Sequence, residues 1–589
     1  MLRLKSPMSR VFSSTILRRF LHMRRSFAAV PVQTPLSVTG PARLSLCSLP
    51  SEILACILCL CEIADIFSCS IVCRSFEYLV RTNIYIRYKI MLDVNGMVDG
   101  PPSHIPISER LQQLKIYTFQ SRNGPDAFIR AQGLPYWRIS PENKDWKLSL
   151  SFSGSTSYIV TKPRLGLVEI ISPASDLQSA TSHWVVPLKL FPQGTVSAVS
   201  VDIVQDLLLV FQEGTDSSSV LRCSMPANIS MTIASSHRQI LVHARSLRKP
   251  DVGHPSAMLS VLHTLAPNPE RVEGIQIHKE RAAWSLSYDR GQSHDIEVWD
   301  WRSGVLVWRS RFHAQVSFAL LDDSYIVAGC RGWNELRLYH VAAAATSTNA
   351  TSTAGVTRDQ SIRLRLPAGS KLERIQESSI PNAPPNVPFW PNPSLRMIAV
   401  SFDDITATSS KKQYRAGLLI PYETLRSILA VRTSGAHVHW DAWGPRNSLL
   451  LHVPSLLHHL DRNFAHSHAF GSRLAVSLSR HGWVPGGIAV IDINPYAARY
   501  SRNPHLRRTW QAGLPRYLDM KRYFGTDSAA LPHVIHYVGE HGVHGNGIVA
   551  ADPYGFTTVS AMTLAHFGHP SKGIKSYSVH TAVEGIRRY

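Results

Sequence analysis

The segment from Leu49 to Leu79 constrains this chain most, because it is more apolar than a short helical segment can bury by itself. Pro50 stands where a helix can begin, and Glu52 follows in the first turn, where the helix dipole favours a carboxylate. The run is interrupted by Glu62 and Asp65, and it is shorter than the roughly 20 apolar residues that a membrane span requires. Apolar side chains recur at helical spacing at Ile53, Leu54, Ile57, Leu58 and Cys61.

Two further short helices are predicted after the first. Asp65 is expected to cap the second helix. A third helical stripe is expected through Val72, Cys73, Phe76 and Leu79. Three helices in about 40 residues bury little of their own surface, so such a unit needs a partner or covalent staples. We therefore expect the surplus apolar face to pack against another protein.

These residues resemble the F-box, the motif with which substrate receptors of cullin-type ubiquitin ligases dock onto the Skp adaptor. The F-box pattern opens with Leu-Pro, has Glu two places later, and closes with Val-Cys-Arg-x-Phe-x-x-Leu. It falls here on Leu49, Pro50, Glu52, Ile53, Leu54, Ile57, Leu60, Asp65, Ile66, Val72, Cys73, Arg74, Phe76 and Leu79. The resemblance implies adaptor contacts by Leu49, Pro50, Ile53, Leu54, Ile57, Leu60, Ile66, Val72, Cys73, Arg74 and Phe76. An ordinary helical hairpin packed on the rest of the protein is the alternative.

Six of the eight cysteines crowd the same region, at Cys47, Cys56, Cys59, Cys61, Cys69 and Cys73. The Cys-x-x-Cys-x-Cys spacing from residue 56 admits a zinc site. However, these thiols lie in an apolar run, and no matched second pair follows at ribbon spacing. We expect them to pack as small apolar side chains, with no metal and no cofactor. A dense thiol cluster without an evident disulfide framework favours a reducing compartment.

The remainder of the 589-residue chain predicts a large all-β domain. We expect the F-box over residues 44–92, a helical linker over 93–135 with an amphipathic helix at Ser108–Phe119, and β structure over 136–589. The fold class is α+β multidomain: a small three-helix F-box followed by a degenerate β-propeller of six to eight blades. Expected strands include Gly166–Ile171, Thr195–Val204, Asp206–Gln212, Arg281–Tyr288, Ile296–Asp300, Val305–Trp308, Tyr325–Ala328, Leu336–Val341 and Gly487–Ile493.

One stretch resembles the Trp-Asp corner of a WD repeat. Residues 295–308 contain Trp299-Asp300 and predict a strand, a tight turn at Ser303-Gly304, and a second strand. Residues 337–339 and 489–492 resemble such corners more weakly. Two insertions are expected: a flexible low-complexity loop over 342–357 and an extended, proline-rich connector over 381–393.

The N-terminus and the net charge leave alternatives open. Residues 1–43 are rich in Arg and Ser and contain no acidic residue, which fits a mitochondrial targeting peptide or a disordered basic tail. The formal net charge of +21 fits nucleic acid or an anionic membrane surface, yet the Lys and Arg are dispersed beyond the N-terminus. We expect neither nucleic-acid binding nor integral membrane association.

The sequence therefore predicts an adaptor with no catalytic residues. No phosphate loop, dinucleotide fingerprint or nucleophile motif occurs, and the histidine pairs at 458/459, 466/468 and 541/544 lack a carboxylate at metal-site spacing. The expected partners are a Skp-type adaptor, through it a cullin, and a protein substrate. The expected location is the cytoplasm or nucleus, with mitochondria open. The alternative functions are a mitochondrial or membrane-associated F-box-like scaffold, and a basic propeller that binds nucleic acid or anionic lipid.

Overall fold

The computed structural model describes residues 46–123, 147–151, 157–162, 165–172, 182–191, 194–214, 239–266, 268–341, 361–378, 387–404, 414–452, 468–478, 487–497, 531, 534–538, 548–552, 555–563 and 575–582. The chain divides into two compact units. The helical unit comprises Met1–Asp93 and Ile105–Gln113, and the β unit comprises Val94–His104 and Leu114–Tyr589.

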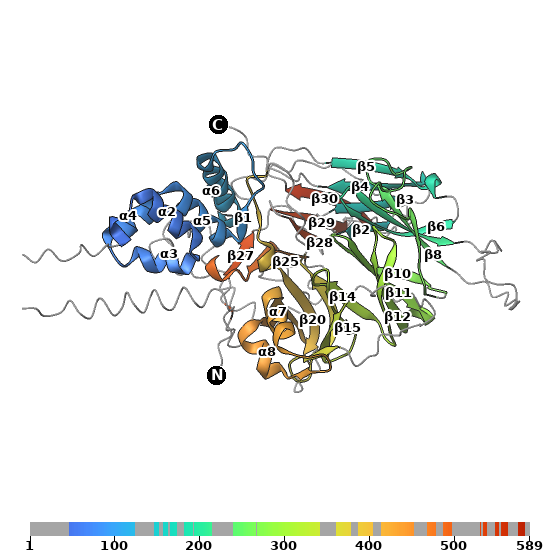
Figure 1. The fold of residues 1–589 in the computed structure, drawn as a ribbon. Helices are drawn as coiled ribbons and strands as arrows, with labels where there is room; N and C mark the ends of the chain where they lie inside the picture. Colours follow the sequence, from blue (N-terminus) through green and yellow to red (C-terminus); the bar gives the residue numbers. More distant parts are fainter. Residues whose placement is uncertain are drawn as a thin grey trace, which may run out of the picture. The chain divides into compact units, whose positions relative to one another are not determined.

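The helical unit begins with a 3-10 turn and continues as short helices (Figure 1). These are η1 (Leu46–Ser48), α2 (Ser51–Leu60), α3 (Ile63–Ser70), α4 (Arg74–Thr82) and α5 (Ile84–Asn95), with α6 (Ile107–Asn123) beginning in this unit and ending in the other. A separate fourth helix, α5, thus follows the three predicted ones. Its start is capped by Asn83, whose Oδ1 accepts hydrogen bonds from the N–H groups of Tyr85 and Ile86 at 3.0 and 3.2 Å.

Two helix starts differ from the sequence prediction. Pro50 is the N-cap residue of α2, and its carbonyl accepts the Leu54 N–H at 3.1 Å. Asp65 does not cap α3, because that helix already begins at Ile63. The Asp65 carboxylate instead lies in the first turn, where the helix dipole favours negative charge. The predicted cap at Asp65 therefore lies three residues after the actual N-cap residue, Glu62.

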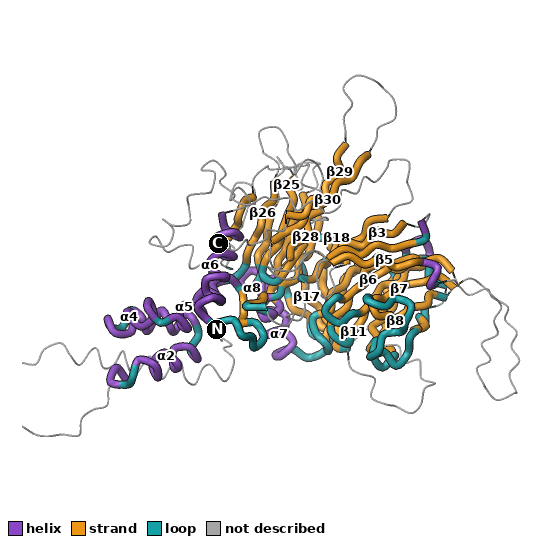
Figure 2. The backbone as a smooth tube through the Cα atoms, turned by 90° about the horizontal axis from the view of Figure 1, so that it is seen from above, coloured by secondary structure: helices purple, strands orange, loops and turns teal. Residues whose placement is uncertain are grey.

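The β unit consists of antiparallel sheets that follow one another in chain order. The strand colours in Figure 1 follow this order, and Figure 2 shows the strands in orange. The first three sheets contain four strands each. The first sheet contains β2 (Lys147–Ser151), β3 (Ser157–Lys162), β4 (Leu167–Ser172) and β5 (Ser182–Pro187). The second contains β6 (Gly194–Asp202), β7 (Leu207–Gly214), β8 (Ile240–Ser246) and β9 (Val261–His263). The third contains β10 (Arg271–His278), β11 (Arg281–Tyr288), β12 (Ser293–Asp300) and β13 (Val305–Phe312).

The later sheets continue the pattern with small departures. They are β14 (Val316–Leu320), β15 (Tyr325–Cys330), β16 (Glu335–His340) and β17 (Ile362–Arg365), extended in parallel by β22 (His437–Val438); then β18 (Lys371–Glu377), β20 (Met397–Asp404), β21 (Tyr414–Pro421) and β23 (Leu449–His452); then β24 (His468–Phe470), β25 (Arg473–Leu478), β26 (Gly487–Asp492) and β27 (Val534–Val538); and finally β28 (Ile548–Asp552), β29 (Gly555–Thr563) and β30 (Lys575–Ala582). Helices α7 (Tyr422–Val431) and α8 (Trp440–Asn447) precede β23.

The packing of these sheets has the character of a β-propeller. The first strand of each sheet contacts the first strand of the next, from β2 against β6 to β24 against β28. Apart from the parallel β22, each of these sheets is a meander of neighbouring antiparallel strands. The first five of them, from β2 to β23, stack face to face through shared apolar cores. The large all-β domain with blade-like sheets predicted from the sequence is confirmed.

The cores lie between consecutive sheets, which explains the unbroken apolar runs in the sequence. Along β7, Leu208 and Val210 face the first sheet, whereas Leu207, Leu209 and Phe211 face the third. A strand covered on both faces has no polar alternation, because successive side chains point to opposite buried sides. Strands β11 and β15 divide their side chains between two cores in the same way.

The predicted hairpin at residues 295–308 is confirmed as β12, a tight turn and β13. Asp300 shapes the turn, because its Oδ1 accepts the N–H groups of Arg302 and Ser303 at 3.0 and 3.1 Å. Gly304 has a φ of +71°, a conformation that glycine adopts without strain. Trp301 is fully buried beside this turn and donates its ring N–H to the Lys279 carbonyl at 2.8 Å.

A buried carboxylate, Asp295 of β12, bonds to two partly exposed arginines of β13. The Asp295 carboxylate is fully buried and accepts hydrogen bonds from Arg311 (Nε, 2.8 Å) and Arg309 (Nη2, 2.6 Å). Tyr288 donates its hydroxyl to the same carboxylate at 3.2 Å. Burial raises the pKa of Asp295, but the hydrogen bonds from Arg311 and Arg309 outweigh it and hold the pKa below its usual value of 3.8.

We predict that Asp295→Asn lowers the free energy of unfolding of the β unit by about 2–3 kcal/mol at pH 7, because two arginines lose their buried counter-charge. The pKa of Asp295 is lower in the folded state than its usual value of 3.8. The stabilisation that the ionised Asp295 carboxylate gives the folded state is therefore present above pH 3.8 and is lost as the pH falls through the folded-state pKa. Urea unfolding at pH 7 and pH 3 measures the difference in free energy of unfolding between wild type and Asp295→Asn. We expect this difference to be smaller at pH 3. An equal loss at both pH values would contradict the prediction.

Where the sequence predicted a helical linker, much of the chain belongs to the β unit, and only Ile105–Gln113 belongs to the helical unit. Strand β1 (Met97–Asp99) pairs antiparallel with β19 (Phe389–Pro391), which lies in the predicted proline-rich connector. Tyr117 of α6 packs its ring against Phe389, with the centroids 5.5 Å apart. Residues 94–104 and 114–123 are therefore structural parts of the β unit.

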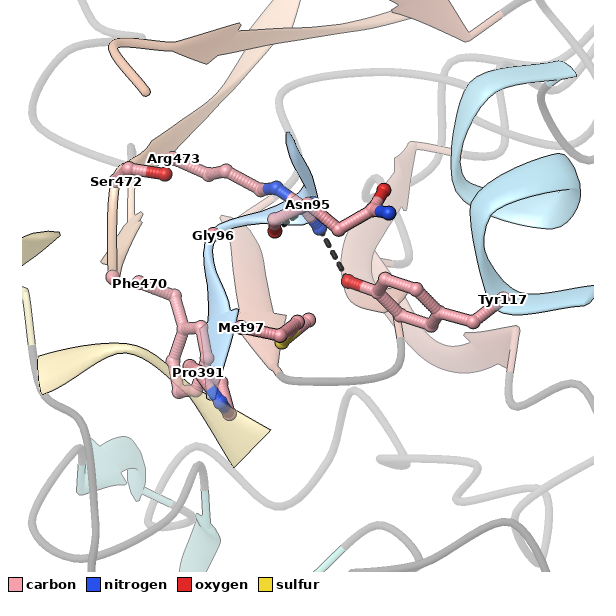
Figure 3. A pocket seen from close by; sticks show the side chains of 9 residues that line it. Asn95, Gly96, Met97, Tyr117, Pro391, Phe470, Ser472 and Arg473 are labelled. Atoms are coloured by element: carbon pink, nitrogen blue, oxygen red, sulfur yellow. Dashed lines mark hydrogen bonds between the residues drawn. The ribbon is translucent and has the colours of Figure 1, made fainter. Parts of the chain in front are cut away.

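Arg473 of β25 joins these segments, as the close view of the shallow pocket in Figure 3 shows. It donates to the Tyr117 hydroxyl at 2.5 Å and to the Asn95 carbonyl at 3.3 Å. Its Nε also lies 3.4 Å from the Asp492 carboxylate. Arg473 thus connects Tyr117 and the Asn95 backbone to β25.

Several expected segments lie outside the described residues. They include 1–43, the low-complexity insertion 342–357, residues 381–386 of the connector, and the histidines at 458, 459, 466, 541 and 544. Strand predictions within the described part are confirmed to within a few residues, and Arg281–Tyr288 has the same bounds as β11.

Candidate docking surface on the helical unit

Helix α2 is apolar on nearly every side, and only part of it is buried. Leu54, Ala55 and Leu58 form its buried stripe, at 7, 5 and 2 % exposure. On the other side, the side chains of Ile53, Ile57 and Leu60 remain 49, 38 and 89 % exposed. A helix with apolar residues all round is normally buried all round. The exposed stripe therefore has the composition of a surface that another protein covers.

More apolar side chains are exposed on either side of α2. They lie in the turn before α2, within α3 and in the turn after α3. Together with the exposed stripe of α2 they make eight residues, which we call the exposed apolar set: Leu46, Leu49, Ile53, Ile57, Leu60, Phe67, Ile71 and Val72. The Cys47 sulfur lies 3.9 Å from the Cys73 sulfur, which places the turn of Leu46 and Leu49 beside the start of α4. Monomeric proteins rarely concentrate so many apolar side chains at their surface.

The residues predicted to contact an adaptor fall into two groups. Leu49, Ile53, Ile57, Leu60 and Val72 belong to the exposed apolar set, and Pro50 and Arg74 are also exposed. Cys73 is partly exposed.

The other group is buried within the helical unit. The side chains of Leu54, Ile66 and Phe76 are only 7, 0 and 4 % exposed, so they are part of the core of the helical unit. Because a partner cannot reach them in this conformation, they support the surface from below. The motif contains core and contact residues at neighbouring positions, and the sequence pattern does not separate them.

Three members of the exposed apolar set were missing from the sequence-based list. Leu46, in the turn before α2, is 37 % exposed. Ile71 is 81 % exposed in the turn after α3, and Phe67 is 42 % exposed within α3. Ile71 is apolar in a turn between predicted helices, a place where polar residues are usual, and that signal could have identified it. No comparable signal distinguishes Phe67 from the buried Ile66 beside it.

Charged residues are also exposed on this unit. Glu52, Glu62 and Arg74 are exposed, and Glu77 and Arg81 form an exposed ion pair along α4 at 3.1 Å. Such exposed pairs contribute little to stability. Apolar residues with charged neighbours match the division of protein interfaces into an apolar core and a polar rim.

The cysteines of this unit divide by environment. Burial raises the pKa of the Cys59, Cys61 and Cys69 thiols, so these remain protonated at neutral pH. Among the residues that the structure describes, no group of three or more His, Cys, Asp or Glu side chains has the arrangement of a metal site. Likewise, none of the described helices is both long enough and apolar enough to cross a membrane.

Comparison with known families agrees with this geometry. Residues 46–87 match the family model of the F-box domain, which spans η1 to α4 and the first turn of α5. The helical unit carries an F-box domain. The match stays inside the predicted boundaries of 44–92, and the exposed apolar set lies wholly within it. No curated protein matches the chain.

Some solved structures resemble the chain at low similarity. The β-propeller domain of the trilobed protease from Pyrococcus furiosus has a TM-score of 0.33 and 8 % identity, covering 74 % of this chain and 95 % of that one. The acylaminoacyl peptidase of Pyrococcus horikoshii gives 0.32 and 8 %, covering 75 % of this chain and 52 % of its own length. The tricorn protease gives 0.27 and 8 %, covering 75 % and 40 %. The propeller description rests on the sheet order given above.

Proposed function

We propose that this protein is the substrate-recognition adaptor of a Skp-cullin-F-box ubiquitin ligase. The observation that carries the proposal is the exposed stripe of Ile53, Ile57 and Leu60 on an F-box helix whose opposite face is already buried. The F-box domain docks on a Skp-type adaptor and, through it, on a cullin. The protein itself has no catalytic role and requires no cofactor.

The propeller-like β unit binds the target protein in this proposal. Simultaneous binding of adaptor and target holds a target lysine close to the conjugating enzyme, so transfer proceeds at a high effective concentration. Large β domains built from repeated sheets offer a broad rigid surface for this task. The reduced thiols of the F-box domain favour the cytoplasm or nucleus as the place of action.

Co-purification with the Skp adaptor tests the proposal. We expect the full-length wild type to retain the adaptor, and the pair variant Leu49→Ala/Pro50→Ala to retain less, because both residues are exposed at the start of α2. Tyr78→Ala is the matched control, since Tyr78 is 70 % exposed on α4 outside the predicted contact residues. Failure of the wild type to bind any Skp-type adaptor would overturn the proposal.

A further inference from the structure

Two cysteines of the F-box domain lie in contact without being joined. Cys47 of η1 and Cys73 at the N-cap of α4 are 26 positions apart in the chain, and their sulfur atoms are 3.9 Å apart. Both are reduced in the structure. A disulfide bond is about 2.05 Å long, so the sulfur atoms need to approach by only about 2 Å. The fold has therefore already brought the two thiols together.

The environment of this pair differs from that of the neighbouring thiols. Cys47 is exposed and Cys73 is partly exposed, so a small oxidant can reach them. The pKa values of Cys59, Cys61 and Cys69 are raised by burial, which keeps those thiols protonated and slow to react. Cys61 also donates its S–H to the Ile57 carbonyl at 3.3 Å. Cys56 is exposed midway along α2 and provides a matched control thiol.

We propose that Cys47 and Cys73 form a reversible disulfide that is made by oxidants of the peroxide class. With hydrogen peroxide, one thiolate attacks a peroxide oxygen, the O–O bond breaks, and a sulfenic acid and hydroxide form; the hydroxide takes the proton that the thiol lost and becomes water. The second thiol then attacks the sulfenic sulfur, the S–S bond forms, and a second water leaves. Two thiols thus supply the two electrons that reduce the peroxide. Exchange with a small thiol reductant restores the pair.

The consequence of this bond rests on the proposed function. The disulfide ties the turn of Leu46 and Leu49 to the residue that precedes α4, within the surface proposed to contact the adaptor. It changes the spacing of these residues and removes the Cys73 thiol from the surface. We expect adaptor binding to weaken on oxidation. Transient regulatory disulfides of this kind are the ones that reducing compartments permit.

Peptide mapping tests the bond without reference to the adaptor. After peroxide treatment and alkylation, trypsin and a glutamate-specific protease together produce three peptides. Peptide 44–52 contains Cys47, peptide 53–62 contains Cys56, Cys59 and Cys61, and peptide 63–74 contains Cys69 and Cys73. We expect a disulfide-linked species of peptides 44–52 and 63–74 in the full-length wild type and in Cys56→Ser. The linked species should be lost completely in Cys47→Ser and in Cys73→Ser. Serine is a favoured N-cap residue, so the latter variant keeps the start of α4.

Absence of this linked species in oxidised wild type, or its persistence in either serine variant, would overturn the disulfide. Adaptor binding then tests the regulatory consequence. We expect oxidised wild type to lose most of its bound adaptor and to recover it with dithiothreitol, whereas Cys47→Ser binds equally under both conditions. Equal binding by oxidised and reduced wild type would overturn the regulatory role. If reduced wild type binds no adaptor, the proposed function fails, and the peptide map still decides the disulfide.

Discussion

The double substitution Ile53→Asp/Ile57→Asp is expected to reduce adaptor binding by about 1,000-fold, because each buried apolar anchor at an interface contributes about 2 kcal/mol. Both side chains are exposed in the free protein, at 49 and 38 %, so the substitutions remove contact surface without emptying the core. An additional carboxylate at position 53 is also compatible with the first turn of α2. Titration calorimetry with the purified Skp adaptor measures the loss.

Two controls separate lost contact from lost folding. Tyr78→Asp adds the same charge to another exposed position, and binding should stay within a few-fold of wild type. Leu58→Asp places a charge at a residue that is 2 % exposed, and circular dichroism should show loss of helix. Wild-type affinity in a folded Ile53→Asp/Ile57→Asp protein would mean that the exposed stripe has another role.

Arg473→Met is expected to lower the free energy of unfolding of the β unit by about 3 kcal/mol, because it leaves a buried carboxylate without its cation. Arg473 is 23 % exposed and Asp492 is 5 % exposed at the side chain. Burial disfavours the guanidinium charge, but Tyr117 and Asp492 outweigh it and keep the pKa of Arg473 above its usual value. The substitution also removes the donors to the Tyr117 hydroxyl and the Asn95 carbonyl.

Urea unfolding followed by tryptophan fluorescence measures this loss. Arg248→Met is the matched control, since Arg248 is 80 % exposed and 3.7 Å from Asp206, and we expect a change below about 0.5 kcal/mol. The double variant Arg473→Met/Asp492→Asn should lose less than the sum of the single variants, because it removes both partners of one pair. Strictly additive losses would show that the pair does not couple.

Local sequence patterns predicted most of the elements. The strands were recognisable because sheet packing on both faces requires unbroken apolar runs, as in Leu207–Phe211 of β7. The hairpin of β12 and β13 was recognisable because Asp300 and Gly304 are residues that a tight turn demands. The start of α3 was misplaced, because an acidic residue is equally favourable at the cap and in the first turn.

The candidate docking surface was predicted less completely. Its location between residues 49 and 79 followed from the surplus of apolar residues, which no short helical unit can bury. Ile53 and Leu54 are equally apolar neighbours, and only the packing of α2 shows that the first is exposed and the second buried. Helical periodicity defines the stripes of a helix, but the neighbouring helices determine which stripe is covered.

The sequence by itself determined that a small helical unit with an exposed apolar face precedes a large domain of repeated sheets. Composition and period are sufficient for this, because they report which side chains must leave water. Only the tertiary structure decided which distant residues meet: Arg473 with Tyr117, 356 positions apart, and Cys47 with Cys73. Such contacts leave no local pattern, because they depend on how whole elements pack and not on the residues beside them in the chain.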